Sequence, residues 1–204
     1  MIKIILINML NFKKVKDNLI HQTAVINWKK ISIGKGNIIG PYVIIGNNAQ
    51  HPILKNSGFI KIGDNNVFNE FTNVHLPTSI KKKTIIGDNN YIMNSTTIDH
   101  DCELENNIIL SSNVTLGGNV YIMNNAQIGI KSSVHQNQII GSYSMLGMHS
   151  FVSKKLLVTP GFIFYGMPAK KVKKNLIGLK RNNISVDIIK KETKRFNDLI
   201  KLRK

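Results

Sequence analysis

The chain has little cysteine, tryptophan and proline. Its 204 residues include one cysteine, Cys102, one tryptophan and five prolines. A single cysteine excludes an internal disulfide, and this usage suits the reducing cytoplasm. The sequence also lacks a run of about 20 apolar residues, so we expect no transmembrane segment. The apolar start is interrupted by Asn8 and Asn11 and has no small-residue cleavage site, so we interpret residues 1–20 as a lead-in segment rather than a signal peptide.

Acidic residues are scarce as well. Eleven aspartates and glutamates stand against 28 lysines and arginines, which gives a formal net charge of +17. Thirteen of the basic residues follow Ala169, against only Asp187, Glu192 and Asp198. Such a tail attracts acidic partners: nucleotide diphosphates, phosphorylated cofactors, an acidic carrier protein or a membrane surface. Because no aromatic stacking platform accompanies the charge, we expect no nucleic-acid partner.

A six-residue repeat occupies most of the chain, and internal repeats decide a fold where they occur. Every sixth residue is aliphatic from residue 86 to residue 158, and Phe164 closes the series: Ile86, Ile92, Ile98, Leu104, Leu110, Leu116, Ile122, Ile128, Val134, Ile140, Leu146, Val152 and Val158. Counting backward in the same phase adds Ile62, Phe68, Val74 and Ile80. An earlier block of Ile33, Ile39 and Ile45 has the same spacing but is offset by one residue. The offset predicts a loop near Gln50–Phe59.

The other positions of the repeat favour a sharp corner after each short strand. The second position is often glycine, the fifth is mostly small, and the fourth is repeatedly asparagine, which tolerates a left-handed backbone. Three hexads then form one triangular coil, and residue n lies beside residue n+18. The predicted fold class is all-β: a parallel β-helix whose left hand is inferred from its resemblance to hexapeptide-repeat proteins.

The repeat stops after Gly166-Met-Pro-Ala, and a helix is expected near the C-terminus. Ser185 is a plausible N-cap, Asp187 falls in the first turn, and apolar residues recur at helical spacing from Ile188 to Ile200. We expect this short α-helical extension to pack on the prism of its own or of a neighbouring subunit. The predicted parts are the lead-in 1–20, a β-helix domain over 21–169 and a basic helical extension over 170–204.

The stacking of successive coils gathers polar side chains on one face. It predicts three adjacent outward columns, which consist of His100, Gly118 and Gln136, of Asp101, Asn119 and Asn137, and of Asp99, Gly117 and His135. This grouping suits acyl transfer from a thioester, because a neutral imidazole such as His100 can take the proton of an attacking hydroxyl or amine. The Gly118 N–H can donate to the developing oxyanion. Asp101 or Asp99 would hold the imidazole tautomer, and the sequence leaves that choice open.

The remaining candidates on this face are substrate contacts. His135 and Gln136 are placed to orient substrate by hydrogen bonds. Cys102 occupies the inward small position, so we interpret it as a core residue rather than a nucleophile. The histidines lack the paired spacing of a zinc site, and no metal is expected.

Several motifs then make the sequence recognisable. They are His21-Gln-Thr-Ala-Val, Ile62-Gly-Asp-Asn-Asn, His100-Asp101-Cys102, Thr115-Leu-Gly-Gly-Asn-Val, Val134-His-Gln, Gly166-Met-Pro-Ala and Asn175-Leu-Ile-Gly-Leu-Lys-Arg181. With these motifs in this order, most of the chain after residue 20 resembles the acyl-carrier-protein-dependent UDP-N-acetylglucosamine O-acyltransferases of the first step of lipid A synthesis and related nucleotide-sugar acyltransferases.

The resemblance implies roles for individual residues. His100 is the implied general base, with Asp101 beside it, and the Gly118 amide is implied at the oxyanion. The implied contacts to substrate or acyl donor are Asn119, His135, Gln136, Asn175, Lys180 and Arg181. It further implies a homotrimer with active sites between prisms, and acyl-CoA or acyl carrier protein as co-substrate with no bound cofactor.

The chain departs from the family pattern around the pocket. Asn119 and Thr97 stand where the O-acyltransferases carry histidines, Asn137 replaces an aromatic residue, and Ile177 replaces an acidic one. We therefore expect a cytoplasmic acyltransferase that acts on an amino or hydroxyl group of a nucleotide-activated sugar, with a preference for the amine, in surface polysaccharide or lipopolysaccharide synthesis. The alternative is the lipid A O-acyltransferase itself. More distant alternatives are a metal hydratase and a non-catalytic β-helix scaffold.

Overall fold

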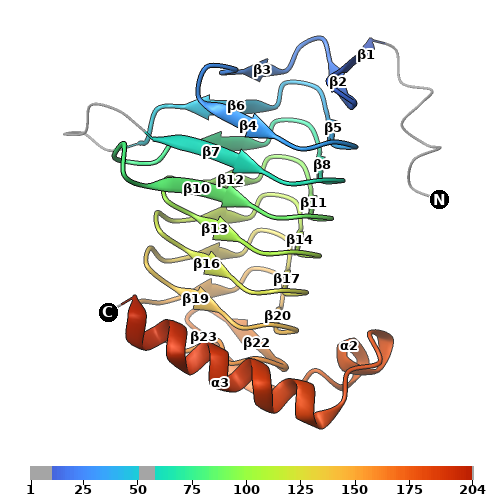
Figure 1. Ribbon diagram of the computed structural model, residues 1–204. Coiled ribbons are helices and arrows are strands. Elements are labelled where there is room, and N and C mark those ends of the chain that lie inside the picture. Colours follow the sequence, from blue (N-terminus) through green and yellow to red (C-terminus); the bar gives the residue numbers. More distant parts are fainter. Residues whose placement is uncertain (1–10, 51–57, 204) are drawn as a thin grey trace.

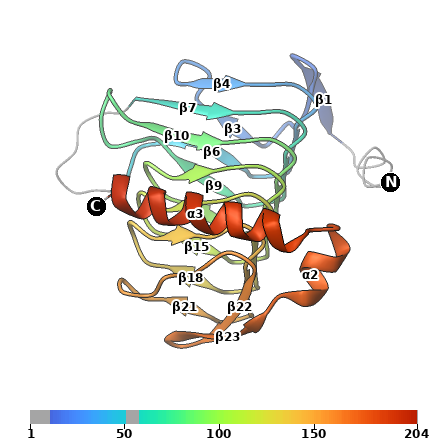
Figure 2. The same ribbon diagram turned by 60° about the horizontal axis from the view of Figure 1, so that its bottom comes forward.

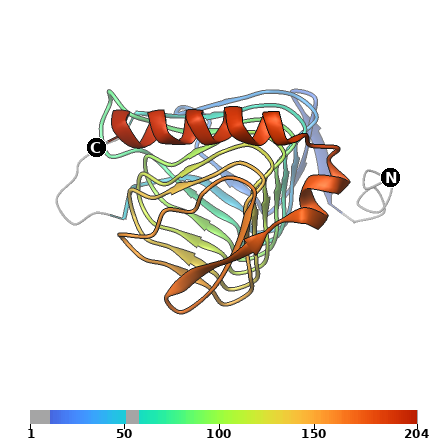
Figure 3. The same cartoon turned by 90° about the horizontal axis from the view of Figure 1, so that it is seen from below.

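The main body of the protein is a prism of short parallel strands (Figure 1). The computed structural model describes residues 11–50 and 58–203. Over these residues the chain winds through three sheets that form the walls of the prism, which Figure 3 shows in a view along its length. Each turn of the chain adds one strand to each wall, as the six-residue repeat predicts.

The three walls are named here by their order along the chain. The first sheet consists of β1 (Phe12–Val15), β2 (Asn18–His21), β5 (Ile38–Ile39), β8 (Val67–Phe68), β11 (Tyr91–Ile92), β14 (Ile109–Leu110), β17 (Gln127–Ile128), β20 (Met145–Leu146), β22 (Phe162–Gly166) and β23 (Ala169–Lys174). The second sheet consists of β4 (Ile31–Ile33), β7 (Phe59–Ile62), β10 (Lys83–Ile86), β13 (Glu103–Leu104), β16 (Tyr121–Ile122) and β19 (Ile139–Ile140). The third sheet consists of β3 (Val25–Ile26), β6 (Ile44–Asn47), β9 (Asn73–His75), β12 (Thr97–Ile98), β15 (Thr115–Leu116), β18 (Ser133–Val134) and β21 (Phe151–Val152).

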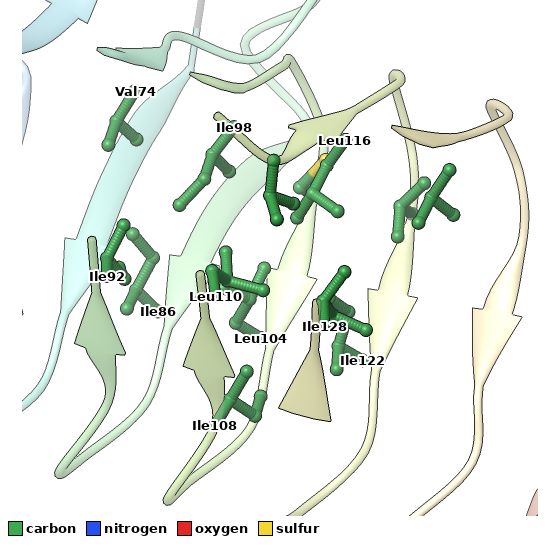
Figure 4. Close-up of a cluster of buried hydrophobic side chains, with 14 of the residues drawn as sticks. Val74, Ile86, Ile92, Ile98, Leu104, Ile108, Leu110, Leu116, Ile122 and Ile128 are labelled. Carbon is green, nitrogen blue, oxygen red and sulfur yellow. The ribbon is translucent and has the colours of Figure 1, made fainter. Parts of the chain in front are cut away.

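The strand register confirms the predicted stacking, in which residue n lies beside residue n+18. Ile86 pairs with Leu104, and Leu104 pairs with Ile122. Figure 4 shows these aliphatic side chains packed in columns inside the prism. Every aliphatic residue of the predicted series from Ile86 to Val158, and Phe164 after it, is at most 3% exposed. Burial of these columns is the main stabilising contribution, since each buried aliphatic side chain adds about 1.5–3 kcal/mol.

The corners have the backbone conformation that the sequence predicts. Asparagines at the fourth position of the hexad have φ near +60°, for example 57° at Asn107 and 60° at Asn113. The last coil ends in a hairpin, because β22 pairs antiparallel with β23. At the other end, β1 pairs antiparallel with β2, and β2 begins the parallel ladder across the expected boundary at residue 20.

One extra residue between β3 and β4 makes the first coil 19 residues long, since Ile20 pairs with Ile39. Two longer insertions also interrupt the coils of the described chain, and one of them was not predicted. Ile33 pairs with Ile62, which is much further along the chain than three hexads and agrees with the loop expected near Gln50–Phe59. Residues 51–57 of that loop lie outside the described part of the chain. The second insertion lies between β9 and β10, because Ile62 pairs with Ile86 rather than with Ile80. The prediction that Ile80 lies in the core is therefore wrong: Ile80 belongs to this insertion and is 76% exposed.

The C-terminal extension crosses the base of the prism. A short helix α2 (Leu176–Arg181) precedes α3 (Val186–Leu202), which lies across the second sheet (Figure 2). Ser185 caps α3 as predicted, since its hydroxyl accepts from the Ile188 N–H. Phe196 is 1% exposed and packs on Met123 and Ile139 of the prism of its own chain. In the described part of the chain, no helix combines the length and apolarity that crossing a membrane requires.

Candidate active site

Two of the three predicted polar columns meet in one cavity at the corner between the third and second sheets, and the column of Asp99, Gly117 and His135 lies outside its lining. The cavity has a volume of about 290 Å³ and is lined by Thr78, Lys82, His100, Asp101, Gly118, Asn119, Gln136 and Asn137. His100 and Asp101 follow β12, and the other columns occupy the same corner in the next two coils. The structure thus brings His100, Gly118 and Gln136 together, as the predicted stacking requires.

The imidazole of His100 lies directly over Gly118. A β-carbon added to Gly118 would be 2.2 Å from Cε1 and 2.5 Å from Nε2 of the ring. Any side chain at this position would therefore occupy the place of the imidazole. The glycine at residue 118 serves a close approach between two coils rather than an unusual backbone angle, because its φ is outside the left-handed region.

Asp101 holds the other side of the ring. Its Oδ2 lies 3.0 Å from His100 Nδ1. A proton on Nδ1 shared with this carboxylate leaves the basic lone pair on Nε2, which is the tautomer that a general base needs. The choice between Asp99 and Asp101, which the sequence leaves open, falls on Asp101 as the partner of the imidazole.

The Asp101 carboxylate is itself firmly held, in a place where its side chain is only 4% exposed. Its oxygens accept from the Thr78 N–H at 3.0 Å, from the Thr78 hydroxyl at 2.8 Å and from Lys82 Nζ at 3.1 Å. Burial alone would raise the pKa of Asp101, but the hydrogen bonds from Thr78, His100 and Lys82 outweigh it and lower the pKa. Asp101 is therefore a carboxylate at neutral pH.

Asp99 supports the same corner from the opposite side. Its Oδ1 accepts from the backbone N–H of His100 at 2.8 Å and lies 3.2 Å from Nδ1 of the buried His75. Burial would raise the pKa of Asp99, and the hydrogen bonds with His75 and His100 lower it overall. Asp99 therefore fixes the backbone that carries the catalytic candidate, whereas Asp101 fixes its ring.

The Gly118 amide is set apart by its place in the cavity rather than by its lack of an acceptor, because the N–H groups of Ser112, Ile130 and Met148 at the same hexad position have no acceptor among the described residues either. At the same hexad position, the N–H of Asp64 donates to Asp88 at 2.8 Å, and the N–H of Asp88 donates to Asn106 at 2.7 Å. Within residues 11–50 and 58–203, the N–H of Gly118 has no such acceptor. A buried donor that lines a cavity without an intramolecular partner is suited to bind a developing oxyanion.

The other predicted contacts are divided between the cavity and more distant surfaces. Gln136 and Asn119 line the cavity. His135, which precedes Gln136 in the sequence, is not part of the lining, and its Nδ1 lies 3.0 Å from the Gln136 carbonyl oxygen. Asn175 caps α2, and its Nδ2 donates to the Tyr143 carbonyl at 3.0 Å. In Figure 1, α2 lies at the opposite end of α3 from the C-terminus. The 17-residue helix between them is about 25 Å long, so Asn175, Lys180 and Arg181 do not reach the cavity of their own chain.

Three residues of this site escaped the sequence prediction. Thr78 and Lys82 come from the insertion between β9 and β10, and Arg203 comes from the end of α3. The insertion is one period long, so it keeps the phase of the repeat and is invisible to periodicity. The signal that was available is polar: Pro77, Thr78 and the lysine run from residue 81 are unusual within a hexad pattern.

Cys102 is a core residue, as predicted. Its side chain is fully buried, and burial raises the pKa of its thiol to about 12. Its Sγ lies 3.3 Å from the Gly117 carbonyl oxygen. In the part of the chain that the structure describes, no three histidine, cysteine, aspartate or glutamate side chains form a group that could hold a metal ion.

Comparisons with known proteins agree with the resemblance seen in the sequence. A family model described as the GMPPB C-terminal domain matches residues 68–184. The chain is 37% identical over 159 residues to the acyl-[acyl-carrier-protein]–UDP-N-acetylglucosamine O-acyltransferase of Burkholderia orbicola, and 35% identical over 158 residues to that of Synechocystis. These matches cover 77% and 76% of this chain, but only 60% and 56% of those relatives.

Solved structures give the same relationship and the hand of the helix. The UDP-N-acetylglucosamine acyltransferase of Bacteroides fragilis superposes with a TM-score of 0.79 at 31% identity, over 87% of this chain and 69% of that one. The Arabidopsis enzyme superposes with a TM-score of 0.65 at 27% identity, over 83% and 78% of the two chains. The predicted left-handed parallel β-helix with a short helical extension is confirmed. The chain thus belongs to the GMPPB C-terminal domain family and, among the proteins of this fold, to the UDP-N-acetylglucosamine acyltransferases.

Proposed function

We propose that the protein transfers an acyl group from a thioester, acyl carrier protein or acyl-CoA, to a hydroxyl of UDP-N-acetylglucosamine. One observation carries this proposal: Asp101 holds the His100 ring against Gly118 in an open cavity. A base, its orienting carboxylate and an oxyanion donor are the groups that acyl transfer requires.

The geometry supports a direct transfer with balanced proton movements. His100 Nε2 takes the proton of the acceptor hydroxyl as its oxygen attacks the thioester carbonyl carbon. The Gly118 N–H donates to the oxyanion of the tetrahedral intermediate, and Asp101 stabilises the imidazolium that has formed. When the intermediate collapses, the C–S bond breaks and the leaving thiolate takes the proton from His100. No acyl-enzyme is needed, and the buried Cys102 takes no part.

The relatives support a hydroxyl acceptor better than the amine that the substitutions in the pocket suggested. The Burkholderia and Synechocystis relatives carry the name of an O-acyltransferase of UDP-N-acetylglucosamine that uses an acyl carrier protein. The amine remains a second candidate, because Asn119 and Asn137 line the cavity at positions where the O-acyltransferase pattern has a histidine and an aromatic residue. An acceptor panel separates the two.

The proposal includes a cytoplasmic homotrimer with active sites in the clefts between prisms. Asn175, Lys180 and Arg181 lie far from the cavity of their own chain, and a neighbouring copy is the arrangement in which they would contact donor or nucleotide phosphates. The surplus of basic residues after Ala169 suits those anionic partners. Light scattering coupled to size-exclusion chromatography tests the assembly, for which three times the 22.9 kDa chain mass is expected and a monomer mass would refute the trimer.

Thiol release measured with DTNB tests the activity. Acyl-CoA and acyl carrier protein donors are offered against UDP-N-acetylglucosamine and against UDP- and dTDP-linked amino sugars. His100→Ala should lower turnover by roughly 10³-fold while the circular dichroism spectrum stays unchanged. His149→Asn is the matched control, because His149 is an exposed corner residue outside the cavity. Near-normal turnover of His100→Ala would refute the mechanism, and release only with amino sugars would move the acceptor to an amine.

A further inference from the structure

The end of helix α3 makes a hydrogen-bonded connection to the cavity. Arg203, the C-cap of α3, donates from Nη2 to Asn119 Oδ1 at 2.7 Å and to the Asn119 carbonyl at 3.3 Å. Asn119 Nδ2 in turn donates to Asn137 Oδ1 at 2.7 Å. Both asparagines line the cavity that contains His100, so the hydrogen-bonded series of Arg203, Asn119 and Asn137 runs from the helix into the candidate site.

Arg203 is anchored well enough to act on Asn119. Its Nη1 donates to Glu103 Oε1 at 2.8 Å, and its guanidinium lies 5.0 Å from the centre of the Tyr121 ring. The side chain is 20% exposed. A guanidinium held by a carboxylate and an aromatic face has little freedom, so the geometry of its contact with Asn119 is fixed.

The chemistry of arginine fixes which amide groups donate and which accept in the hydrogen bonds from Arg203 to Asn137. A guanidinium has only donors, so Asn119 must present its carbonyl oxygen to Arg203 and its NH2 group to Asn137. Asn137 then presents its carbonyl oxygen to Asn119, and its own NH2 group is left as the end of the connection. Without Arg203, both amides could exchange the places of their oxygen and nitrogen at little cost, and the same position would then present an acceptor.

The docking of α3 determines whether Arg203 reaches the cavity. About two helical turns before it, Phe196 packs into the prism on Met123 and Ile139 and holds the helix there. Both Asn137 and Arg203 line a second cavity, which has a volume of about 170 Å³. The docked helix therefore places Arg203 beside Asn119 at the edge of the site.

We propose that Arg203 is a positioning residue that orients the Asn119 and Asn137 amides, so that Asn137 offers an N–H donor to an oxygen of the acceptor substrate. The chemical class recognised is a hydrogen-bond acceptor oxygen of the nucleotide sugar: a carbonyl, hydroxyl or phosphate oxygen. This inference rests on the proposed function for the identity of that substrate, and on the contacts of Arg203 for the orientation itself.

Two readouts on the full chain test the proposal. Steady-state kinetics with UDP-N-acetylglucosamine should show that Arg203→Met raises KM for the sugar about tenfold, the effect of one ordinary hydrogen bond, with a smaller change in kcat. Arg203→Lys retains a donor and should recover part of the loss. Arg195→Met is the matched control, since Arg195 lies in the same helix without contacting Asn119, and its KM should stay within about twofold of the wild type. In an Asn119→Ala background, Arg203→Met should add little.

Side-chain amide signals provide the second readout, which does not require turnover. In protein labelled with ¹⁵N-asparagine, Arg203→Met should shift the NH2 resonances of both Asn119 and Asn137, whereas Arg195→Met should leave them in place. Absence of turnover in the wild-type protein would refute the proposed function. It would not refute the proposed orientation of the Asn119 and Asn137 amides, which the NH2 signals test separately. Unchanged amide signals in Arg203→Met, or equal KM values for Arg203→Met and Arg195→Met in an active protein, would overturn the inference.

Discussion

Replacing Gly118 by alanine tests the contact at the centre of the site. The added β-carbon would lie 2.2 Å from Cε1, 2.5 Å from Nε2 and 2.8 Å from Nδ1 of His100. Ordinary contact between carbon atoms requires about 3.5–4.0 Å, so the ring must retreat by about 1.5 Å. The backbone itself tolerates alanine, because φ at residue 118 is outside the left-handed region. The strain thus falls on the imidazole.

The size of the effect follows from what the retreat breaks. The 3.0 Å contact between His100 Nδ1 and Asp101 Oδ2 cannot survive such a shift, and a hydrogen bond to a charged group contributes about 1.5–3 kcal/mol. The replacement of glycine by alanine also stabilises the folded protein by about 0.4–1 kcal/mol, because it lowers the conformational entropy of the unfolded chain. The net loss is about 1–2 kcal/mol, which for a chain of this length lowers Tm by about 3–6 °C. Because the base leaves its position by more than about 1 Å, kcat should fall at least on the order of 10²-fold.

Thermal denaturation and the DTNB assay measure the two effects together. The decisive control is the same substitution in a His100→Ala background, where no ring is present to be displaced. There Gly118→Ala should stabilise the protein by about 0.5 kcal/mol instead of destabilising it. Gly118→Ala with normal kcat, or with an equal Tm change in both backgrounds, would refute the idea that residue 118 and the imidazole compete for one space.

Three further outcomes are expected. The pKa values of Asp99 and Asp101 are lower in the folded protein than the ordinary 3.8. Their contribution to stability should therefore be complete above pH 3.8 and be lost as the pH falls through the lowered values. In a plot of Tm against pH, Asp101→Asn should reduce the fall in Tm at acid pH. Cys102, with its thiol pKa raised to about 12 by burial, should react with DTNB only after unfolding in guanidinium, and labelling of the native protein would contradict its burial. Phe196→Ala should weaken the docking of α3 by about 3 kcal/mol, which would be measured as faster amide hydrogen exchange in that helix. The same variant should raise KM for the acceptor, as Arg203→Met does. Slow amide exchange in the variant would count against the docking.

Much of the fold could be predicted because each strand obeys one local rule. An aliphatic residue at every sixth position has a single arrangement that buries it, so the columns around Leu104 and Leu116 follow from spacing alone. The six-residue spacing cannot reveal an insertion of six residues, because such an insertion leaves the positions of the aliphatic residues in phase. For that reason the spacing predicts Ile80 in the core, whereas Ile80 is an exposed loop residue. The insertion before β7 is not a multiple of the period, so it does change the phase, and that loop was visible in the sequence.

The site could be predicted as far as the repeat determines it. The stacking of coils places His100 over Gly118, and the structure confirms that pair. The partner of the imidazole could not be chosen, because Asp99 and Asp101 flank His100 equally in sequence. The choice depends on the turn at residue 101, where φ is 62°, and on donors from outside the repeat. The contact of Arg203 with Asn119 joins residues that are far apart in the chain, and no local pattern indicates it.

The parts of the chain outside the repeat explain how a regular prism can carry a specific site. At a corner, an outward side chain has neighbours only in the coils above and below, about 4.8 Å away, and these are copies of the same small set of residues. Such neighbours place a base over a glycine, but they do not hold a buried carboxylate charged or fix the direction of an amide. The insertion between β9 and β10 supplies Thr78 and Lys82 for the first task, and α3 supplies Arg203 for the second. Changes in these two segments should therefore alter pKa values and acceptor choice while the prism, and the contact of His100 with Gly118, stay as they are.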